Sequence, residues 1–376
     1  MTRAIEELIP EFIRGLPVYI PGRPIEEVEH ELKIRAIKLA SNENPLGPSP
    51  KAMEAVKSAL MEAHRYPDGG TCRLREKLAR KHGVKPEEIF VGLGSSEIID
   101  LAARILLTRG LTGLTAEGSY APFSIAIRAN GANLTLVPLR EFTFDLKAMA
   151  QALTPQTHVV FLANPNNPTG TAFGQAELEE FLTRVPDDVL VVLDEAYIHY
   201  AERADMPRSL EVFRGRTNLL ILRTFSKVYG LAGLRVGYGI GRAEIVAAMN
   251  KLRTPFNVTG LAQAAALAAL DDEEHVRRSM ETNRTERKRL CEELGKLGLR
   301  AVRSEANFIF VEIGLEAKTI SEELLLEGVI VRPLGWMGFP EAVRVSAGTA
   351  EENGRFLEVM SRLWTKRAGK SEWTPR

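Results

Sequence analysis

Three side chains with different chemistry each follow a short apolar segment of the chain. Lys227 lies just beyond the run NLLILRTF, Asp194 ends the run VLVVLD, and Asn167 lies just beyond HVVFLANP. Such runs predict strands buried on both faces of a mainly parallel sheet, and ligands bind where the carboxyl ends of these strands meet. Singly, Asp194 could cap a helix and Asn167 could belong to a turn. Together, the three predict one catalytic site at the edge of a sheet.

These residue types suit chemistry with pyridoxal phosphate. A lysine amine can form a Schiff base with the aldehyde of that cofactor, provided that burial or nearby cations depress its pKa. A carboxylate such as Asp194 would keep the pyridine nitrogen protonated, so that the ring can accept electrons. The amide of Asn167 and the hydroxyl of Tyr197 would hold the ring oxygen.

The same stretches offer donors for a phosphate group. Thr224 and Ser226 lie just ahead of Lys227, and Arg235 would bring a guanidinium fork. The sequence GLGSSE (92–97) is expected to open a helix, whose free backbone N–H groups attract anions. Its candidate phosphate ligands are Gly94, Ser95 and Ser96. The sequence does not meet the GxGxxG pattern of a dinucleotide site, which leaves a phosphate cup as the interpretation.

The elements that must position these groups alternate between strands and helices. Apolar runs bounded by Gly, Pro, Asn or Asp predict strands at 89–94, 133–139, 158–165, 189–196 and 218–225. The spacing of apolar residues predicts intervening helices at 96–110 and 174–185. This alternation predicts an α/β fold, with a mainly parallel central sheet flanked by helices.

The chain after residue 250 has a different pattern. Residues 259–298 carry no strand signal and predict one or two long helices. Strands at 307–313, 328–334 and 342–348 around a helix at 316–327 are typical of a smaller α+β domain. We therefore expect an N-terminal arm (1–35) joining the small domain, a large domain (36–255), a small C-terminal domain (256–365) and a tail (366–376).

The composition is that of an ordinary globular protein and disfavours some partners. The 376 residues are 45% hydrophobic, and 49 Lys plus Arg balance 49 Asp plus Glu, which argues against nucleic acid or an anionic membrane as the main partner. The N-terminus lacks the apolar core of a signal peptide, and no apolar stretch is long enough to span a membrane. Cys72, Cys291 and the histidines show no metal-ligand spacing. We expect a cytoplasmic protein with reduced thiols and no metal.

Motifs along nearly the whole chain resemble those of fold-type I pyridoxal-phosphate aminotransferases, in the class II branch that includes histidinol-phosphate aminotransferase. These motifs are SNENPLGPSP (41–50), RYPDGG (65–70), GLGSSEIID (92–100), ANPNNPTG (163–170), DEAY (194–197), TFSKVYGLAGLRVGY (224–238) and VRVSAGTAEEN (343–353). The resemblance implies the pyridoxal-phosphate-dependent transferase fold, with a large cofactor-binding domain and a smaller α+β domain. It also implies pyridoxal 5'-phosphate as cofactor and transamination as the reaction, with 2-oxoglutarate as the amino acceptor.

The resemblance also implies roles for individual residues. Lys227 would bind the cofactor covalently and move protons as general base and acid, while Asp194 would pair with the pyridine nitrogen. Tyr120 would stack on the ring, and Tyr66 would reach the cofactor phosphate of a neighbouring subunit. A residue shared in this way implies a homodimer with two joint active sites.

The resemblance further points to the substrate. L-Histidinol phosphate carries a phosphate where an amino acid carries its α-carboxylate, and this branch binds that phosphate with the carboxylate-binding arginine, a second arginine and an N-terminal tyrosine. Arg344, Arg332 and Tyr19 match those positions. With Asn167, they favour L-histidinol phosphate as donor, which places the reaction in histidine biosynthesis. Asn42 and Asn44, in SNENP, lie where this segment of the family approaches the substrate, and the resemblance is compatible with either a structural role or a substrate contact.

One segment departs from the branch and keeps other activities open. Phe256 stands where several members have a tyrosine whose hydroxyl reaches the phosphate, although Asn257 could compensate. The missing hydroxyl favours overlapping activity on aromatic amino acids. Threonine-phosphate decarboxylase, which resembles the same branch, is another enzymatic alternative. A pseudo-enzyme used only as a binding scaffold is disfavoured, because Lys227 and Asp194 are both present.

Overall fold

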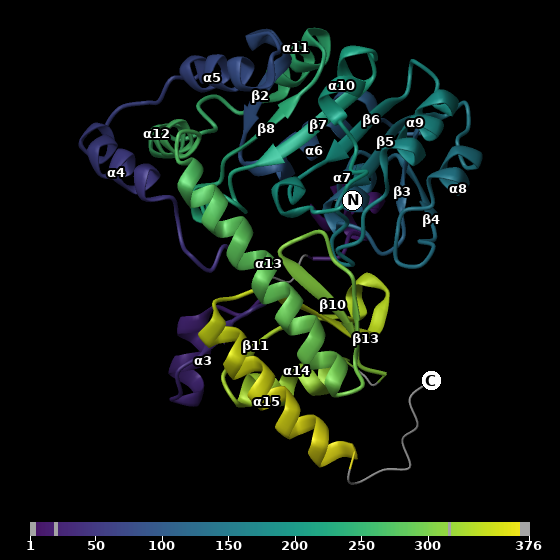
Figure 1. The fold of residues 1–376 in the computed structure, drawn as a ribbon. Helices are drawn as coiled ribbons and strands as arrows, with labels where there is room; N and C mark the ends of the chain where they lie inside the picture. Colours follow the sequence, from purple (N-terminus) through teal and green to yellow (C-terminus); the bar gives the residue numbers. More distant parts are fainter. Residues whose placement is uncertain (1–4, 19–21, 315–316, 369–376) are drawn as a thin grey trace.

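The computed structural model describes residues 5–18, 22–314 and 317–368, which form a large part and a small part (Figure 1). The large part is built on a seven-stranded sheet with the order β2-β8-β7-β6-β5-β3-β4. Its strands are β2 (Ile89–Gly92), β3 (Thr112–Ala116), β4 (Asn133–Val137), β5 (Thr157–Ala163), β6 (Leu190–Asp194), β7 (Leu219–Thr224) and β8 (Gly237–Ile240). Strand β8 runs antiparallel to β2 and β7, whereas the other pairs are parallel. The predicted α/β fold with a mainly parallel sheet is confirmed.

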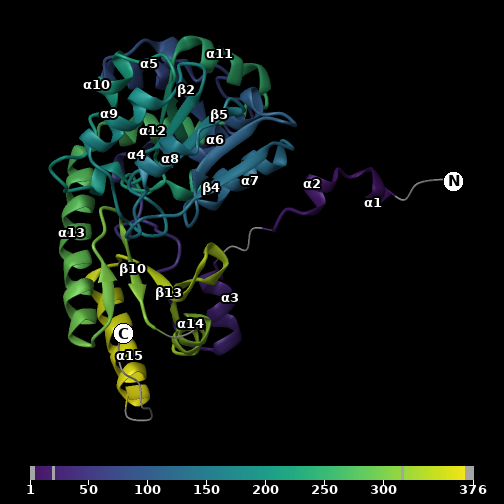
Figure 2. The ribbon, with the colours of Figure 1, turned by 90° about the vertical axis from the view of Figure 1, so that its right-hand side faces the viewer.

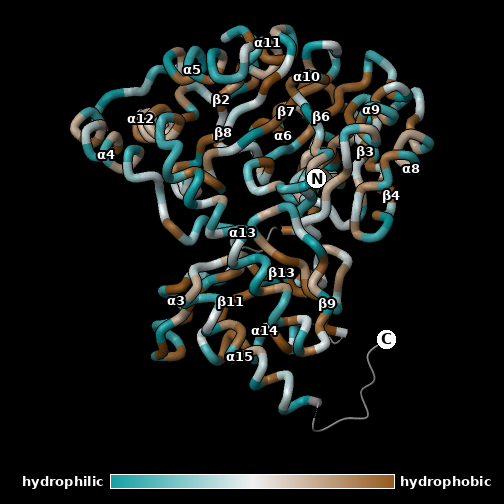
Figure 3. The backbone as a smooth tube through the Cα atoms, viewed as in Figure 1, coloured by the Kyte–Doolittle hydropathy of each residue, from teal (hydrophilic) through white to brown (hydrophobic). Residues whose placement is uncertain are grey.

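Helices flank this sheet and explain its continuous apolar strands. They are α4 (Pro50–Ala59), α5 (Cys72–His82), α6 (Gly94–Leu106), α7 (Ala121–Ala129), α8 (Leu146–Gln151), α9 (Gln175–Arg184), α10 (Ser209–Arg214), α11 (Ala243–Leu252) and α12 (Gly260–Ala269). All five residues of β6 are buried, as expected for a strand covered on both faces. Figure 3 shows the same separation, with apolar strands inside and many hydrophilic residues on the outer helices and loops.

The small part has its own sheets and its own core. Its elements are β1 (Ile37–Lys38), β9 (Arg300–Val302), β10 (Phe308–Glu312), β11 (Val329–Ile330), β12 (Arg332–Leu334), β13 (Phe339–Ser346), α3 (Ile25–Leu32), α13 (Glu273–Lys296), α14 (Ala317–Leu326) and α15 (Ala350–Ala368). Strands β12-β13-β10-β9 form an antiparallel sheet, and β1 pairs in parallel with β11. Leu290, Ile309, Val345 and Phe356 belong to a core separate from that of the large part.

Residues 259–298, predicted as one or two helices, form two, α12 and α13. In Figure 1, α13 runs from the large part down into the small part. Helix α12 packs against α4, and its residues Ala262, Ala266 and Ala269 lie in the core of the large part. The expected domain boundary at residue 256 stays a prediction, and the packing of α12 favours a later boundary, near the start of α13.

The N-terminal segment has an outer and an inner half. Helix α1 (Ile5–Leu8) extends away from the body of the chain (Figure 2), and Ile5 and Leu8 are exposed, whereas α2 (Glu11–Arg14) contacts α7. Helix α3 instead packs on the small part, where Val28 lies in a cluster with Ile330 of β11. None of the described helices is both long and apolar enough to cross a membrane.

The large sheet differs from the sequence analysis in two respects. Strands β3 and β8 were not predicted; β8 has the sequence GYGI, whose glycines read as a loop. Glycine is needed there, because a Cβ on Gly237 would lie 2.7 Å from the carbonyl carbon of Gly94 and 2.8 Å from the backbone nitrogen of Ser95. Strand β4, predicted as buried, is partly exposed because it lies at the edge of the sheet, where it has one neighbouring strand.

Candidate active site

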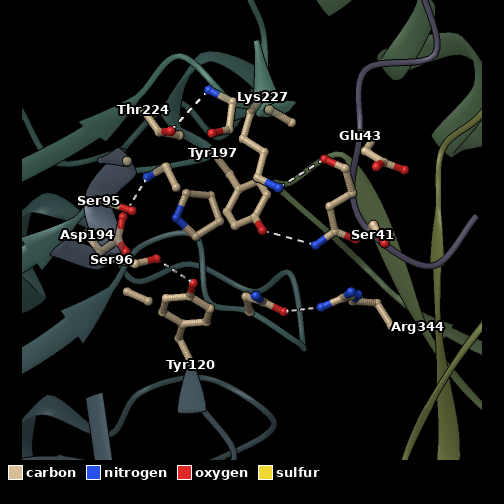
Figure 4. Close-up of a pocket in the computed structure, with 18 of the residues that line it drawn as sticks. Ser41, Glu43, Ser95, Ser96, Tyr120, Asp194, Tyr197, Thr224, Lys227 and Arg344 are labelled. Carbon is tan, nitrogen blue, oxygen red and sulfur yellow. Dashed lines mark hydrogen bonds between the residues drawn. The ribbon is translucent and has the colours of Figure 1, made fainter. Parts of the chain in front are cut away.

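A pocket lies at the carboxyl ends of β5, β6 and β7, where the large part faces the small part (Figure 4). Most of the predicted site residues line this pocket. They are Gly94, Ser95, Ser96, Tyr120, Asn167, Asp194, Tyr197, Thr224, Ser226, Lys227, Arg235, Arg332 and Arg344. Their individual roles stay predictions, but the fold brings residues from both halves of the chain into one cavity.

One predicted residue within the described part of the chain does not line this pocket. Tyr66 is 83% exposed and stacks on Phe256, with the ring centroids 4.7 Å apart. It was expected to serve a neighbouring subunit, so its position outside the pocket of its own chain leaves that prediction open. Tyr19 lies outside the described residues.

Lys227 lies between the two walls of the pocket, as Figure 4 shows. Its Nζ donates a hydrogen bond to the backbone oxygen of Asn42 at 3.1 Å and lies 5.4 Å from the centre of the Tyr197 ring. Burial, and then the positive charge of Arg344, lower the pKa of Lys227 to about 7. A large fraction of this amine is therefore neutral near pH 7, as attack on an aldehyde requires.

Asp194 ends β6 and is 5% exposed. Its Oδ1 accepts a hydrogen bond from the backbone nitrogen of Ala196 at 3.0 Å. Burial raises the pKa of Asp194 to about 7, against the opposing effect of this hydrogen bond. A cation beside Asp194 would favour the carboxylate. The protonated ring nitrogen of pyridoxal phosphate is such a cation, so the group fits this position.

Asn42 connects the two walls, and sequence reasoning had left its role open. Its Nδ2 donates to the hydroxyl of Tyr197 at 3.0 Å, and its backbone nitrogen donates to Oγ of Ser346 at 2.8 Å. The backbone of Asn42 has a φ of 54°, in the left-handed region that asparagine tolerates better than most residues. The motif SNENP singled out Asn42 in the sequence, but it did not predict the hydrogen-bond partners of this residue.

The end of the pocket formed by α6 and the loops around β7 and β8 has the donors of a phosphate site. Helix α6 begins at Gly94, and the side chain of the preceding residue, Leu93, makes no capping hydrogen bond. The N-cap residue therefore leaves the first backbone N–H groups of the helix to other acceptors. Gly94 has a φ of 70°, and a Cβ there would lie 2.9 Å from Nη2 of Arg235. Ser95, Thr224 and Ser226 add hydroxyl groups. Backbone N–H, hydroxyl and guanidinium donors together fit the phosphate of pyridoxal phosphate.

The small part contributes two arginines to the opposite wall. Arg332 on β12 and Arg344 on β13 are cross-strand partners and are 9% and 8% exposed. Arg344 donates to Oδ1 of Asn167 and to the backbone oxygen of Ala40, both at 2.6 Å, while the Arg332 guanidinium lies 5.0 Å from the Trp336 ring centre. Like charges on directly opposite residues repel each other. An anion bound between these arginines and the pocket would relieve that repulsion.

Tyr120 lies at a third side of the pocket. Its hydroxyl is 3.2 Å from Oγ of Ser96, and its ring packs edge-on against Phe123 with the centroids 5.6 Å apart. Figure 4 shows the hydroxyl of Tyr120 directed at Ser96. These contacts hold an aromatic ring at the pocket wall, where a planar cofactor ring could stack on it.

Comparison with known proteins gives a consistent result across the chain. The family model described as aminotransferase class I and II matches residues 34–360. Histidinol-phosphate aminotransferase 2 of Pseudomonas fluorescens is 47% identical over 354 residues, covering 93% of this chain and 96% of that protein. Histidinol-phosphate aminotransferase of Moorella thermoacetica is 47% identical over 355 residues, covering 94% and 92%.

Solved structures agree with these sequence matches. The crystal structure of histidinol-phosphate aminotransferase from Sinorhizobium meliloti in complex with pyridoxal-5'-phosphate superposes with a TM-score of 0.88 at 28% identity, covering 95% of this chain and 97% of that one. Aspartate aminotransferase from Thermus thermophilus with maleate is also similar, with a TM-score of 0.81 at 25% identity, covering 94% and 99%.

Proposed function

The chain belongs to the aminotransferase class I and II family, and from this premise we propose that it is a histidinol-phosphate aminotransferase of histidine biosynthesis. It transfers an amino group between L-histidinol phosphate and a 2-oxo acid, 2-oxoglutarate in our proposal, with pyridoxal 5'-phosphate as cofactor. One observation carries the proposal beyond the family. The pocket holds a lysine and a carboxylate on one wall and two buried, adjacent arginines on the other.

Pyridoxal phosphate, when bound, supplies an aldehyde that takes up the substrate amine and a ring that accepts electrons from the substrate Cα. Lys227 would hold the cofactor covalently through its Nζ. Because the pKa of Lys227 is about 7, this amine can both accept and release a proton near neutral pH. Lys227 Nζ would be the group that takes up and gives back the proton at the substrate Cα.

Other residues would fix the cofactor in the orientation that this proton movement needs. Asp194 would pair with the ring nitrogen, and Tyr197 and Asn167 would hold the ring oxygen. The Tyr197 hydroxyl already accepts a hydrogen bond from Asn42, so its own proton is available for donation. Burial raises the pKa of Tyr197 further, so the phenol keeps that proton.

The two arginines would hold the substrate by its phosphate. A phosphate dianion can satisfy the donors of Arg332 and Arg344 together, whereas an α-carboxylate brings a single negative charge. This difference favours histidinol phosphate over a neutral-side-chain amino acid. We therefore expect the enzyme to distinguish the two donors mainly at the arginine wall.

Kinetics with alternative donors tests this proposal. With 2-oxoglutarate as acceptor, we expect kcat/KM to be at least about tenfold higher for L-histidinol phosphate than for L-phenylalanine, a difference of roughly one charged hydrogen bond. A ratio that strongly favours phenylalanine would assign the protein to the aromatic aminotransferases. Release of carbon dioxide from threonine phosphate without formation of glutamate would instead assign it to the decarboxylases.

We also propose that the enzyme is a homodimer with shared active sites. Around the Tyr66–Phe256 stack the chain exposes apolar side chains, with Leu60 51%, Met61 79% and Phe256 44% exposed. A second copy of the chain would cover this surface. Tyr66 would then reach the cofactor phosphate in the neighbouring site.

Mixing two damaged chains tests this arrangement. Lys227→Ala and Tyr66→Ala homodimers should each be impaired, but a heterodimer contains one site with both residues intact. We expect activity to recover when the two variants are unfolded and refolded together, and not when each is refolded alone. Absence of recovery, in a preparation shown by mass to be dimeric, would mean that Tyr66 serves its own chain.

Both cysteines are free, consistent with the cytoplasmic location that we propose.

A further inference from the structure

A buried ion pair lies directly behind the Asp194 carboxylate. Glu195, the next residue, is 2% exposed, and its Oε2 accepts hydrogen bonds from Nε and Nη2 of Arg223 at 2.9 and 2.8 Å. The Arg223 side chain is 15% exposed. Neither residue lines the active-site pocket, so the proposed reaction does not use them directly.

The strand geometry puts this pair on the far side of the sheet edge from the pocket. Asp194 of β6 is opposite Leu222 of β7, and the backbone nitrogen of Glu195 donates to the oxygen of Leu222 at 2.9 Å. Successive side chains of an extended chain point to opposite faces. Asp194 therefore faces the pocket, whereas Glu195 points back to Arg223, which follows Leu222 on β7.

The ion pair continues into a chain of buried polar groups. Arg223 is the cross-strand partner of Tyr238 on β8. The Tyr238 hydroxyl lies 2.9 Å from Nε2 of His82. Burial and the nearby Arg223 lower the pKa of His82 and of His199 to about 3, so both rings are neutral at physiological pH. The charges in this cluster are therefore those of Glu195 and Arg223.

Stability alone does not account for such a pair. Removing two charges from water costs about as much free energy as their attraction returns, and apolar replacements of buried ion pairs are often neutral or stabilising. The functional group beside this pair is Asp194. Besides burial, the negative charge of Glu195 raises the pKa of Asp194, and Arg223 lies where it can offset that charge.

We propose that Glu195 and Arg223 are positioning residues that balance the charge next to Asp194, so that Asp194 meets the cofactor ring nitrogen as an anion. This inference rests on the proposed pyridoxal-phosphate chemistry. It adds two residues that touch neither cofactor nor substrate and act through Asp194.

The other charged groups around Asp194 belong to the site itself. Lys227, after β7, lowers the pKa of Asp194, and Tyr197, three residues further along the chain, is influenced by the Asp194 charge. The groups that act on Lys227 are Arg344, Glu43, Arg235 and Asp194. Changes at Glu195 and Arg223 should therefore affect Asp194 more than the lysine.

The test is the pH dependence of cofactor binding by the apoprotein. Pyridoxal phosphate is titrated into apoprotein at a series of pH values around neutrality. The acid limb of the affinity profile reports the ionisation of both Asp194 and Lys227, and of these two groups Glu195 acts on Asp194. Glu195→Gln should move this limb to lower pH and Arg223→Met to higher pH, each by roughly one pH unit. The double variant, which removes both charges, should return towards the wild type.

Opposite shifts separate charge balance from mere structural support. If the pair only supports the fold, both single variants should weaken binding in the same direction at every pH, and the double variant should be no better; that result would overturn the inference. If the wild-type apoprotein binds no pyridoxal phosphate, the proposed function fails instead. The two failures are therefore distinguishable.

Two further variants are controls, one for the loss of an unrelated carboxylate and one for misfolding. Glu88→Gln removes another carboxylate that faces an arginine, Arg242 at 3.5 Å, near the other end of β2 and β8, and should leave the acid limb unchanged. Arg223→Lys keeps the charge and should keep the limb near its wild-type position, even if Arg223→Met does not fold. An unshifted limb in a folded Glu195→Gln protein would also overturn the inference.

Discussion

The two walls of the pocket are built in different ways. The wall on the large part consists of residues that directly follow the strands of one sheet, such as Asp194 after β6 and Lys227 after β7, and they share one core. The opposite wall combines Asn42, from the loop after β1, with Arg332 and Arg344 from a separate sheet that has its own core.

A small number of direct contacts join these walls. Lys227 donates to the backbone of Asn42, the Asn42 amide donates to Tyr197, and Arg344 donates to Asn167. The difference suggests a division of work, in which the large part holds the cofactor rigidly and the small part recognises the substrate. Substitutions in the first wall should then change kcat and cofactor binding, and those in the second should mainly change KM.

Replacement of Lys227 should have the largest effect and tests the first wall. Lys227→Ala removes the covalent attachment and the proton carrier, so we expect kcat to fall by at least about 10³-fold, towards the upper range for general acid–base groups. Lys227→Arg, which keeps the charge but stays protonated, should be equally inactive. Borohydride treatment of the loaded wild type, followed by peptide mapping, should label Lys227, and a label on another lysine would contradict its role.

Replacement of Arg344 tests the second wall. Arg344→Lys keeps the charge but loses the planar fork that contacts both Asn167 and Ala40. We expect kcat/KM for histidinol phosphate to fall roughly 10- to 150-fold, equivalent to about 1.5–3 kcal/mol for a charged hydrogen bond, with most of the loss in KM. Cofactor affinity should not change. Arg300→Lys, on the exposed side of β9, is the matched control.

Asp194 and Lys227, on the first wall, were predicted to lie close together for a physical reason. Apolar runs identify buried strands, and polar residues at the ends of parallel strands must meet at one edge of the sheet, as Asp194 and Lys227 do. The second wall depends on how two separate cores pack. Local patterns predict the short strands that carry Arg332 and Arg344, but only the resemblance to a family indicated that they face the pocket. The hydrogen bonds of Asn42 were missed because they join segments far apart in the chain.

Replacing the two asparagines of SNENP, Asn42 and Asn44, should have smaller effects, which test the same division of work between the walls. Asn44 donates to the backbone oxygen of Val228 and to Oγ of Ser279 on α13, at 2.9 and 2.8 Å, and is 8% exposed. Asn44→Ala should lower the free energy of unfolding by about 1–3 kcal/mol, because buried groups lose their partners, while kcat stays near the wild-type value. Asn42→Ala should instead lower kcat, because it removes the donor to Tyr197 and so acts on the first wall. Urea denaturation and steady-state kinetics on both variants would show whether the two effects separate.

The smallest predicted effect is that of Glu43, on the second wall, on the pKa of Lys227, on the first wall. Glu43 lines the pocket and its charge raises the pKa of Lys227, against the larger lowering effects of burial and Arg344. Only the neutral amine attacks an aldehyde, so the rate of cofactor capture by the apoprotein should rise with pH through about 7 and then level off. Glu43→Gln removes a charge that favours the protonated amine, so the midpoint of this rise should move to lower pH.

The Glu43 shift should be small, because this carboxylate is half-exposed and already pairs with Lys38 at 3.1 Å. Glu54→Gln, which removes an exposed carboxylate paired with Lys57 on α4, should leave the midpoint unchanged. Stopped-flow absorbance of pyridoxal phosphate mixed with each apoprotein gives the midpoint. A midpoint that stays constant in Glu43→Gln would mean that Glu43 does not act on the lysine electrostatically, which would leave Arg344 as the charge of the second wall that does.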